Sequence, residues 1–521
     1  MDGHPQPRCA SLSHRCASLE RVIVDSRLNL TDEVEARRQR VSEQLEQSRR
    51  IELGQFFTPS PIATFLSSMF DLRDRPSSLL DPGAGVGSLT AAFVARWGAE
   101  CSSPLSVTAC EVDSSLHDEL SATLTSCEQV PNVGADLLEA NFIEWSTESL
   151  GGLRFEAAPT FSHVVMNPPY RKLANGSHDR NLLRWVGMDA PNLYAAFLAL
   201  GARLLEPGGQ LVAITPRSFA NGPYFRSFRR DLLSWVSLRR IHVYDSRDVA
   251  FADSEVLQEN VVFLAERCDE RSSVFVTSSS SPLSSEVTGR LVPYTEVVRP
   301  DDSEQFIHLS PDAGVAAVAS GVAALPSTIA SLGVAVSTGR VVDFRSREHL
   351  RAQPEADTVP LIYPTHMADG GLSWPKDGKK PNALVRCEDT DAMLLPAGYY
   401  VVVKRFSSKE ERRRIVASVI RDGDLPGECW AFENHLNVIH TANHGLDPLL
   451  ANGMAVWLNS TVVDTAFRQF SGHTQVNATD LRNMRYPARD DLYSLGEAAG
   501  SSTLTQEKID GLVTEHVGAL G

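Results

Sequence analysis

The residues with the clearest chemical potential are Asn167, Pro168, Pro169 and Tyr170, which follow the apolar run 161–166. That run predicts a buried strand, so the four residues would lie at its carboxyl end, where open α/β sheets bind ligands. Asn167 offers a carboxamide oxygen, Pro168 a carbonyl oxygen on a stiffened chain, and Tyr170 a flat apolar face. Such a set could hold a planar ring that carries an amino group.

A glycine-rich stretch provides a second candidate site. Asp81 precedes Gly83, Gly85 and Gly87, and the surrounding pattern indicates a strand end, a turn and the start of a helix. This is the glycine pattern of a loop that binds a nucleotide-like ligand, because glycines let the backbone approach closely and a helix N-terminus faces the ligand. Taken alone, however, such a loop is more often a bare turn.

Polar residues at further strand ends support the binding interpretation. The apolar run 105–110 ends in Glu111 and Asp113, where folds of this kind place an acid that accepts hydrogen bonds from ribose hydroxyls. Asn141 lies in a third candidate turn, and Asn167 ends the fourth predicted strand. Acidic or amide residues at four successive strand ends predict a ligand site along one edge of a sheet.

The elements that must position these residues alternate between strand and helix patterns from about 75 to 266, which predicts one doubly wound Rossmann-like α/β sheet. A serine-rich stretch at 272–285 predicts a linker, and the alternation is lost beyond it. We therefore expect a tail and helix in 1–50, the α/β domain in 51–270, a linker region in 271–330, a mixed α+β domain in 331–490 and a C-terminal tail in 491–521.

Composition and charge narrow the class of protein only partly. The 521 residues with 42% hydrophobic side chains predict a globular protein with a substantial core. The net charge of −16 does not exclude nucleic acid, which needs only a local positive surface. The eight cysteines show no zinc-like spacing, and the start of the chain lacks the apolar core of a signal peptide. We expect a cytoplasmic protein with reduced thiols, no metal site and no membrane span.

Together these motifs resemble the N6-adenine DNA methyltransferases of bacterial restriction-modification systems, in the motif order with cofactor motifs first and target recognition last. Residues 54–59 match the family's N-terminal cofactor motif, and 81–87 match its S-adenosylmethionine loop. Residues 167–170 match its catalytic tetrapeptide completely, and Glu111 falls on its ribose-binding acid. One departure is Asn141, because the family usually has Asp at that position.

The resemblance implies a role for each matching residue. The Asn167 side chain and the Pro168 carbonyl would accept hydrogen bonds from the adenine amino group, while Tyr170 stacks on the flipped base and Pro169 shapes the turn. Thr58 would contact the methionine part of S-adenosyl-L-methionine. The remaining predicted cofactor contacts are Asp81, Gly83, Gly85, Glu111 and Asn141, with Asp136 as the alternative to Asn141.

Two C-terminal pieces, 404–414 and 472–481, are similar to modification methylases of the XhoI or PstI type. Basic side chains in such pieces could contact the DNA backbone, and amide and guanidinium groups could read bases, although a solvated surface is the simpler alternative. The predicted DNA-binding residues are Arg405, Arg412, His473, Gln475, Asn477 and Arg482.

The resemblance therefore implies a type II modification enzyme that acts on double-stranded DNA, as a monomer, and protects it from a cognate restriction endonuclease that need not bind this chain. No nuclease domain is expected, because the cofactor motif begins by Gly54. Two alternatives stay open at this point. One is a methyltransferase for RNA or for a protein glutamine, and the other is a catalytically idle DNA-binding subunit.

Overall fold

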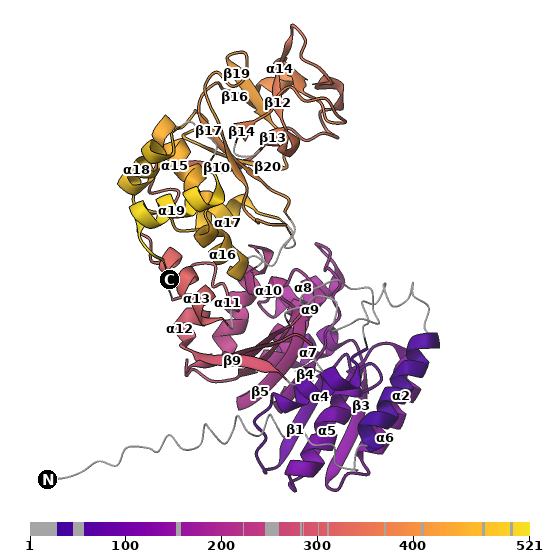
Figure 1. Cartoon of the computed structure of the whole chain (residues 1–521). Coiled ribbons are helices and arrows are strands. Elements are labelled where there is room, and N and C mark those ends of the chain that lie inside the picture. The colour runs from indigo at the N-terminus through magenta and orange to yellow at the C-terminus, as the bar shows by residue number, and fades with distance from the viewer. Residues whose placement is uncertain are drawn as a thin grey trace, which may run out of the picture. The chain divides into compact units, whose positions relative to one another are not determined.

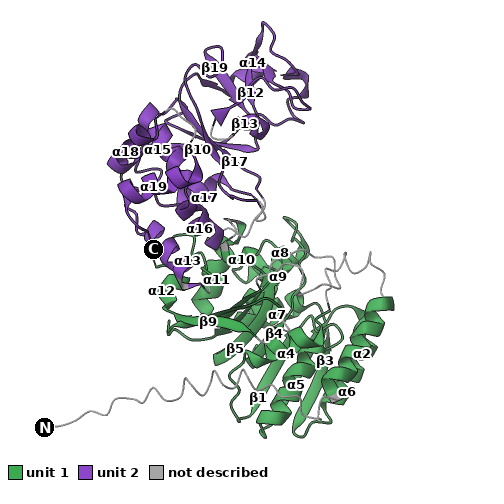
Figure 2. Ribbon diagram, in the orientation of Figure 1, with its two compact units in different colours: residues 1–311 green, residues 312–521 purple. Residues whose placement is uncertain are grey.

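A computed structural model describes most of the chain and divides it into two compact units, Met1–Pro311 and Asp312–Gly521, each described by itself (Figure 1; Figure 2). The described residues are 29–44, 57–152, 158–221, 223–244, 260–281, 284, 286–300, 302–309, 312–368, 371–407, 411–470, 475–500 and 504–520.

Unit 1 is built on a nine-stranded sheet with the order β3-β2-β1-β4-β5-β7-β6-β8-β9. Strands β3, β2, β1, β4 and β5 run parallel, and β7 is antiparallel to both of its neighbours. The strands are β1 (Ser77–Pro82), β2 (Leu105–Glu111), β3 (Val133–Glu139), β4 (Phe161–Met166), β5 (Leu205–Pro216), β6 (Ser237–Tyr244), β7 (Asn260–Glu266), β8 (Val274–Ser279) and β9 (Val287–Val292).

Helices cover both faces of this sheet. Their bounds are α2 (Asn29–Gln44), α4 (Ser60–Ser68), α5 (Ser88–Glu100), α6 (His117–Cys127), α7 (Phe142–Leu150), α8 (His178–Trp185), α9 (Leu193–Arg203), α10 (Ser218–Asn221), α11 (Arg226–Trp235) and α12 (Tyr294–Val297), with 3₁₀ turns η2 (Ser114–Leu116) and η3 (Pro223–Phe225).

The burial pattern explains the two layers of helices. In β4 every residue is buried, as expected for a parallel strand covered on both sides. Val165 packs into one apolar cluster with α4 and α5, whereas Val164 and Met166 pack into a second cluster with α7, α9 and α11. Because successive side chains of a strand point to opposite faces, the sheet has helices on both sides. The predicted doubly wound fold is confirmed.

The region 271–330, predicted to be a linker, instead contains the last two strands of this sheet. Val274 and Val276 are buried, and β8 pairs in parallel with β6. The two ring nitrogens of His242 lie 2.9 Å from Thr277 Oγ1 and 3.1 Å from Ser279 Oγ. Serine and threonine side chains that are hydrogen-bonded in this way can lie inside a sheet. The serine-rich composition therefore led to the wrong prediction of a linker.

The described residues of unit 2 form three sheets. The four-stranded sheet has the order β10-β20-β17-β18, the five-stranded sheet β11-β15-β12-β19-β16, and β13 pairs with β14. The strands are β10 (Ala335–Thr338), β11 (Leu350–Arg351), β12 (Thr358–Ile362), β13 (Met367–Ala368), β14 (Gly371–Leu372), β15 (Ala383–Val385), β16 (Leu394–Pro396), β17 (Tyr400–Lys404), β18 (Ala417–Ile420), β19 (Cys429–Phe432) and β20 (Leu436–His440).

The four-stranded sheet is the middle layer of unit 2. Val401 and Val403 of β17 pack against helices, whereas Tyr400 and Val402 pack against Trp430 of the five-stranded sheet. This arrangement confirms the predicted mixed α+β character. The helices are α13 (Ala313–Ala323), α14 (Glu388–Asp391), α15 (Pro448–Leu458), α16 (Thr461–Phe470), α17 (Ala478–Asn483), α18 (Arg489–Ala499) and α19 (Gln506–Val517), with 3₁₀ turns η4 (Arg347–His349) and η5 (Pro364–His366).

The segment 491–521, predicted to be a tail, is largely helical and belongs to the core of unit 2. Helix α18 crosses α15 at two glycines, Gly453 and Gly496, whose backbones come together. A Cβ atom at Gly496 would lie 1.9 Å from the carbonyl oxygen of Leu449, so only glycine permits this crossing. Gly453 and Gly496 are remote in sequence, so no local pattern indicated that these two helices pack together.

None of the helices in the described residues is both long enough and apolar enough to span a membrane.

Candidate functional site

A pocket in unit 1 lies at the carboxyl ends of the parallel strands β1, β2 and β4 and beside the residues that follow β3. In the spatial order of the strands, Asn141 follows β3, Glu111 ends β2, Gly83 and Gly85 follow β1, and Asn167 follows β4. All five residues line the pocket. The four predicted strand-end positions therefore meet in one site.

The glycine loop forms the floor of this pocket between β1 and α5. The N–H groups of Gly83 and Ala84 donate to the Cys110 carbonyl oxygen at 2.8 and 2.9 Å, which ties the loop to the end of β2. Gly85 has a φ of 60° and its absent Cβ would lie 3.2 Å from the ring of Phe57. A larger residue at this position would be strained and would push into the pocket.

Glu111 lines the pocket while its carboxylate is held by three backbone N–H groups. Its Oε2 accepts from Gly85 at 2.8 Å, and its Oε1 accepts from Val112 and Asp113 at 2.9 and 2.8 Å. Burial raises the pKa of the Glu111 carboxyl, and the backbone hydrogen bonds oppose that effect. A carboxylate oriented in this way has the geometry to accept hydroxyl groups of a ribose.

Asp81, predicted as a cofactor contact, does not line the pocket. Its side chain is fully buried behind the glycine loop, and its Oδ2 accepts from the Thr90 hydroxyl of α5 at 2.7 Å. Burial raises the pKa of the Asp81 carboxyl to about 7. Asp81 therefore joins the end of β1 to α5 and supports the loop from behind.

Asn167 and Tyr170 are linked to each other and to the N-terminal motif. The Asn167 side-chain nitrogen donates to Thr58 Oγ1 at 3.0 Å, and the Tyr170 hydroxyl donates to the Asn167 side-chain oxygen at 3.1 Å. Asn167, Pro169 and Thr58 line the pocket, whereas Pro168 is buried. Burial raises the pKa of the Tyr170 phenol, so its hydroxyl stays protonated and available as a donor.

Asn141, and not its alternative Asp136, lies at the pocket. Asp136 is exposed in the middle of β3, at the edge of the sheet, and does not line the pocket. Asn141 caps helix α7 by accepting from the Ile143 N–H at 2.9 Å, and it donates to Asp179 Oδ1 at 3.4 Å. The structure thus brings Asp179 of α8 to the site, which the sequence patterns did not indicate.

Aromatic and apolar residues complete the walls of the pocket. Phe57, Val112 and Phe197 line it, and Val112 is a large apolar side chain left exposed. Flat apolar surfaces beside an oriented carboxylate suit the base of a nucleoside. Phe57 belongs to the quoted N-terminal motif, but Phe197 was only one of several apolar residues in a helical pattern, so its role had no separate signal.

The predicted DNA-binding residues lie in unit 2, and the structure brings two of the pieces together. Phe406 forms a bridge with Gln475, and the Val476 N–H donates to the Arg405 carbonyl oxygen at 2.7 Å. Phe406 is 47% exposed, and its ring lies 4.9 Å from that of His435. Segments about seventy residues apart in the sequence therefore form one surface that carries amide, guanidinium and aromatic groups.

The other predicted DNA-binding residues are in different situations. Arg412 is exposed. The Asn477 N–H donates to Asp480 Oδ2 at 2.7 Å at the start of α17, and Arg482 donates to the Val336 carbonyl oxygen at 2.7 Å. His473 lies outside the described residues. Asn477 and Arg482 thus have structural contacts in addition to any with DNA.

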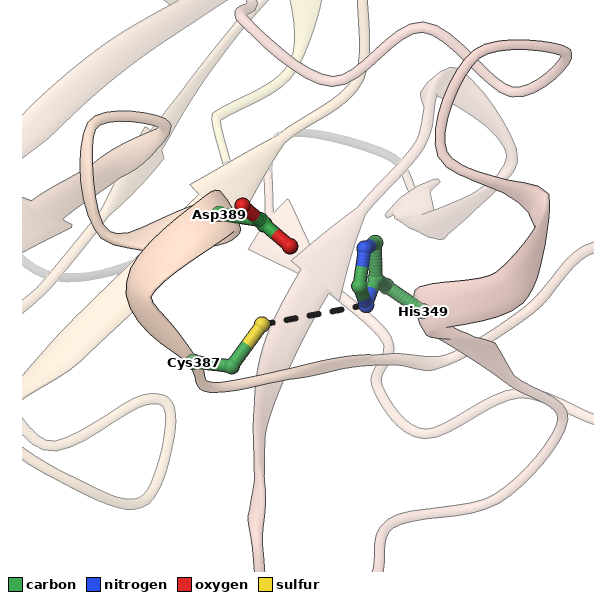
Figure 3. Close-up of side chains that lie close together, drawn as sticks. All are labelled: His349, Cys387 and Asp389. Atoms are coloured by element: carbon green, nitrogen blue, oxygen red, sulfur yellow. Dashed lines mark hydrogen bonds between the residues drawn. The ribbon is translucent and has the colours of Figure 1, made fainter.

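A group of possible metal ligands in unit 2 was not foreseen. His349, Cys387 and Asp389 each offer one atom, and these atoms lie within 4.8 Å of one another (Figure 3). The pairing of β11 with β15 brings His349 and Cys387 together, with Sγ 3.8 Å from Nδ1. The prediction of no metal site relied on the spacing of cysteines in the sequence, and this spacing does not reveal which strands pair. Cys387 also contacts Thr390, and the cluster takes no part in the reaction proposed below.

The pocket of unit 1 brings the glycine loop, Glu111 and Asn167 together at the strand ends of a doubly wound sheet. This fold and the place of its pocket are those of an S-adenosylmethionine-dependent methyltransferase. Residues 108–250 match the family described as Eco57I restriction-modification methylase.

Two relatives are similar over nearly the whole chain. Type II methyltransferase M.BsuBI of Bacillus subtilis is 44% identical over 450 residues, covering 86% of this chain and 90% of the relative. Type II methyltransferase M.PstI of Providencia stuartii is 39% identical over 492 residues, covering 93% and 96%. Among solved structures, the type IIG restriction endonuclease BpuSI matches with 13% identity and a TM-score of 0.41, covering 88% of this chain and 62% of that one.

The chain therefore belongs to the type II DNA methyltransferases of restriction-modification systems. It is an adenine-specific enzyme that depends on S-adenosylmethionine. This membership confirms the predicted family and the predicted reaction. The two alternatives, an enzyme for RNA or protein glutamine and an idle DNA-binding subunit, are therefore no longer supported.

Proposed function

We propose that methyl transfer takes place where the ends of β1 and β4 meet, with Asn167 and Pro168 as acceptors for the target adenine. The amino nitrogen of adenine is a poor nucleophile because its lone pair is delocalised into the ring. Hydrogen bonds from its two N–H groups to the Asn167 side-chain oxygen and the Pro168 carbonyl would localise that lone pair. The observation that carries the proposal is that Asn167 shares one pocket with Gly85 and Glu111.

The electron balance requires no strong base. S-adenosylmethionine supplies a methyl group on a positively charged sulfur when it is bound. The nitrogen forms a bond to the methyl carbon as the carbon–sulfur bond breaks, and one amino proton then leaves to solvent. The work of this chain is to position the amino group and to present acceptors that are already oriented. A carbonyl oxygen has two lone pairs, so Asn167 can accept from Tyr170 and from the adenine together.

The cofactor contacts of the proposal follow the order of the strand ends. Glu111 would accept the ribose hydroxyls, the loop with Gly83 and Gly85 would face the ribose and methionine parts, and Thr58 would lie beside the methionine part. Asn141 follows β3, next to β2, so the adenine of the cofactor would lie at that end. Apolar walls at Phe57 and Phe197 support a nucleoside in this orientation.

For DNA, we infer that unit 2 holds the duplex through the surface formed by residues 404–406 and 475–477 together with Arg412. Guanidinium groups would contact phosphates, and Gln475 has the paired donor and acceptor that reads adenine in the major groove. Tyr170 would stack on the adenine after it leaves the duplex. We further propose that the protein acts as a monomer on either strand of the duplex. A cognate endonuclease would recognise the same sequence without binding this chain.

The decisive experiment is methyl transfer from labelled S-adenosylmethionine to duplex DNA by Asn167→Ala. We expect a loss of turnover of about a hundredfold or more, because one preorganised acceptor is removed. Cofactor binding should remain within about threefold of wild type. Asn181→Ala, an exposed asparagine on α8, is the matched control and should keep full activity. Near wild-type turnover in Asn167→Ala would refute the proposed mechanism.

A second experiment addresses the DNA surface. Sequencing of methylated DNA from cells that express the chain gives the methylated base, its position and the surrounding motif. Gln475→Ala should relax the motif at one base pair, since a bidentate base contact contributes about 1–3 kcal/mol of discrimination. An unchanged motif with Gln475→Ala would remove this residue from the recognition surface.

A further inference from the structure

The side chain of Asn141 is oriented by two neighbours that leave it a single arrangement. Its Oδ1 accepts from the Ile143 N–H at 2.9 Å, and its Nδ2 donates to Asp179 Oδ1 at 3.4 Å. A backbone N–H only donates and a carboxylate only accepts, so both contacts select the same orientation of the carboxamide. The oxygen of Asn141 is thus already engaged in capping α7.

Asp179 brings a carboxyl group to the same rim of the pocket. It is half-buried, lines the pocket and lies in the first turn of α8, where the helix dipole favours a negative charge. The position of this turn is set by Ser177, whose Oγ accepts from the Arg180 N–H at 3.4 Å, and by the fully buried Leu183. Asp179 therefore projects from an anchored helix and not from a free loop.

Chemistry at this end of the pocket calls for a strong acceptor. The edge of adenine presents an exocyclic amino group, which donates, next to a ring nitrogen, which accepts. An aspartate at position 141 would satisfy the amino group, and the resemblance to the family leads one to expect it there. This chain has a neutral amide at 141, whose oxygen already accepts one bond and is a weaker acceptor than a carboxylate. Two carboxylates line the described pocket, those of Glu111 and Asp179, and Asp179 is the one that contacts Asn141.

We propose that Asp179 accepts a hydrogen bond from the exocyclic amino group of the cofactor's adenine, and that Asn141 positions the Asp179 carboxylate for this contact. The negative charge at the adenine end then comes from helix α8 and not from the residue after β3. This inference rests on the proposed placement of the cofactor along the strand ends. It assigns Asp179 a binding and specificity role that does not involve the methyl group or the DNA.

The test measures equilibrium binding of S-adenosylhomocysteine to the full chain by calorimetry, compared with its 6-deamino analogue, in which hydrogen replaces the amino group. Wild type should bind the analogue about tenfold more weakly, as expected for one lost hydrogen bond to a charged group. Asp179→Asn should bind S-adenosylhomocysteine about tenfold more weakly than wild type and should distinguish the two ligands poorly. The double variant Asn141→Asp/Asp179→Asn moves the carboxylate back to position 141 and should restore the preference.

Glu144→Gln is the matched control, because Glu144 is an exposed carboxylate in the first turn of α7 and does not line the pocket. It should leave both affinities unchanged. A wild-type preference retained by Asp179→Asn would overturn the proposal. So would an equal loss of affinity for both ligands, which would mark Asp179 as a purely structural residue. A double variant that still lacks the preference would refute the exchange of acceptor between the two positions.

Failure of this inference is distinguishable from failure of the proposed function. If wild type does not bind S-adenosylhomocysteine at all, the proposed cofactor site is wrong. If wild type binds it without preference over the 6-deamino analogue, the site stands and the role of Asp179 is wrong. Unfolding midpoints in urea for all variants show whether a loss of binding reflects a loss of folded protein.

Discussion

Thr58 Oγ1 accepts a hydrogen bond of 3.0 Å from the side-chain nitrogen of Asn167, a residue 109 positions further along the chain. Both residues line the pocket, Thr58 just before α4 and Asn167 just after β4. The contact connects the segment expected beside the methionine part of the cofactor with the residue expected to hold the target amino group. Under the proposed placement, the cofactor and the target adenine would therefore lie beside the same hydrogen-bonded pair.

Removal of the Thr58 hydroxyl should therefore reduce turnover more than cofactor affinity. Thr58→Val keeps the shape of the side chain but removes an acceptor for Asn167, so the carboxamide is held less firmly. We expect single-turnover methyl transfer to slow by about tenfold, with the Kd for S-adenosylhomocysteine changed by less than about threefold. Thr58→Ser retains the hydroxyl and should stay near wild type. If Thr58→Val weakens S-adenosylhomocysteine binding but leaves the rate of single-turnover methyl transfer unchanged, this linkage is contradicted.

The buried carboxyl of Asp81 should make stability depend on pH. Its folded pKa of about 7 lies above the ordinary 3.8, so its contribution is fully present below about pH 4 and is lost as the pH rises toward 7. The loss corresponds to roughly 4 kcal/mol at most. Asp81→Asn cannot ionise, and its urea midpoint should rise relative to wild type between pH 4 and pH 7. If the urea midpoints of wild type and Asp81→Asn differ by the same amount throughout that pH range, Asp81 does not titrate in this way.

Arg412 should contribute to DNA affinity without contributing to sequence preference. It is exposed, and a guanidinium that contacts a phosphate adds one released counterion. Arg412→Gln should weaken binding to cognate and unrelated duplexes alike and should reduce the slope of log K against log salt by about one. The control is Arg386→Gln, another exposed arginine of unit 2. An unchanged salt slope in Arg412→Gln would exclude the phosphate contact.

The crossing of α15 and α18 should tolerate no side chain at its centre. Gly496→Ala would place a Cβ atom 1.9 Å from the Leu449 carbonyl oxygen, so the helices must separate, at a cost of about 2–4 kcal/mol. Gly511→Ala, in the exposed interior of α19 with nothing within 4 Å of the added atom, should instead stabilise by up to about 1 kcal/mol. Thermal unfolding of both variants measures these changes in stability. Equal changes in the two variants would contradict the prediction.

The catalytic half of the molecule was predictable because its residues carry local signals. A fully apolar run followed by Asn167 and Pro168 locates a strand end, and regularly placed glycines locate the neighbouring loop. Both signals depend only on the nearest residues in the chain. The match of β4 to the predicted run 161–166 follows from this.

Features that depend on tertiary partners were not predictable in the same way. Thr277 and Ser279 of strand β8 hydrogen-bond to His242 of β6, and Asp179 lies beside Asn141 because α7 packs against α8. His349 and Cys387 meet through the pairing of β11 with β15. In each case the partner is remote in sequence, so no periodicity or spacing in the chain records it.

In the part of the chain that the structure describes, no residue belongs to apolar clusters of both units. The clusters around the nine-stranded sheet end at Leu309, and those of unit 2 begin at Val322. Substitutions on the surface that joins Phe406 to Gln475 therefore need not disturb the packing that holds Asn167 and Glu111. Under the proposed division of labour, a lineage can acquire a new recognition sequence while inheriting its catalytic machinery unaltered.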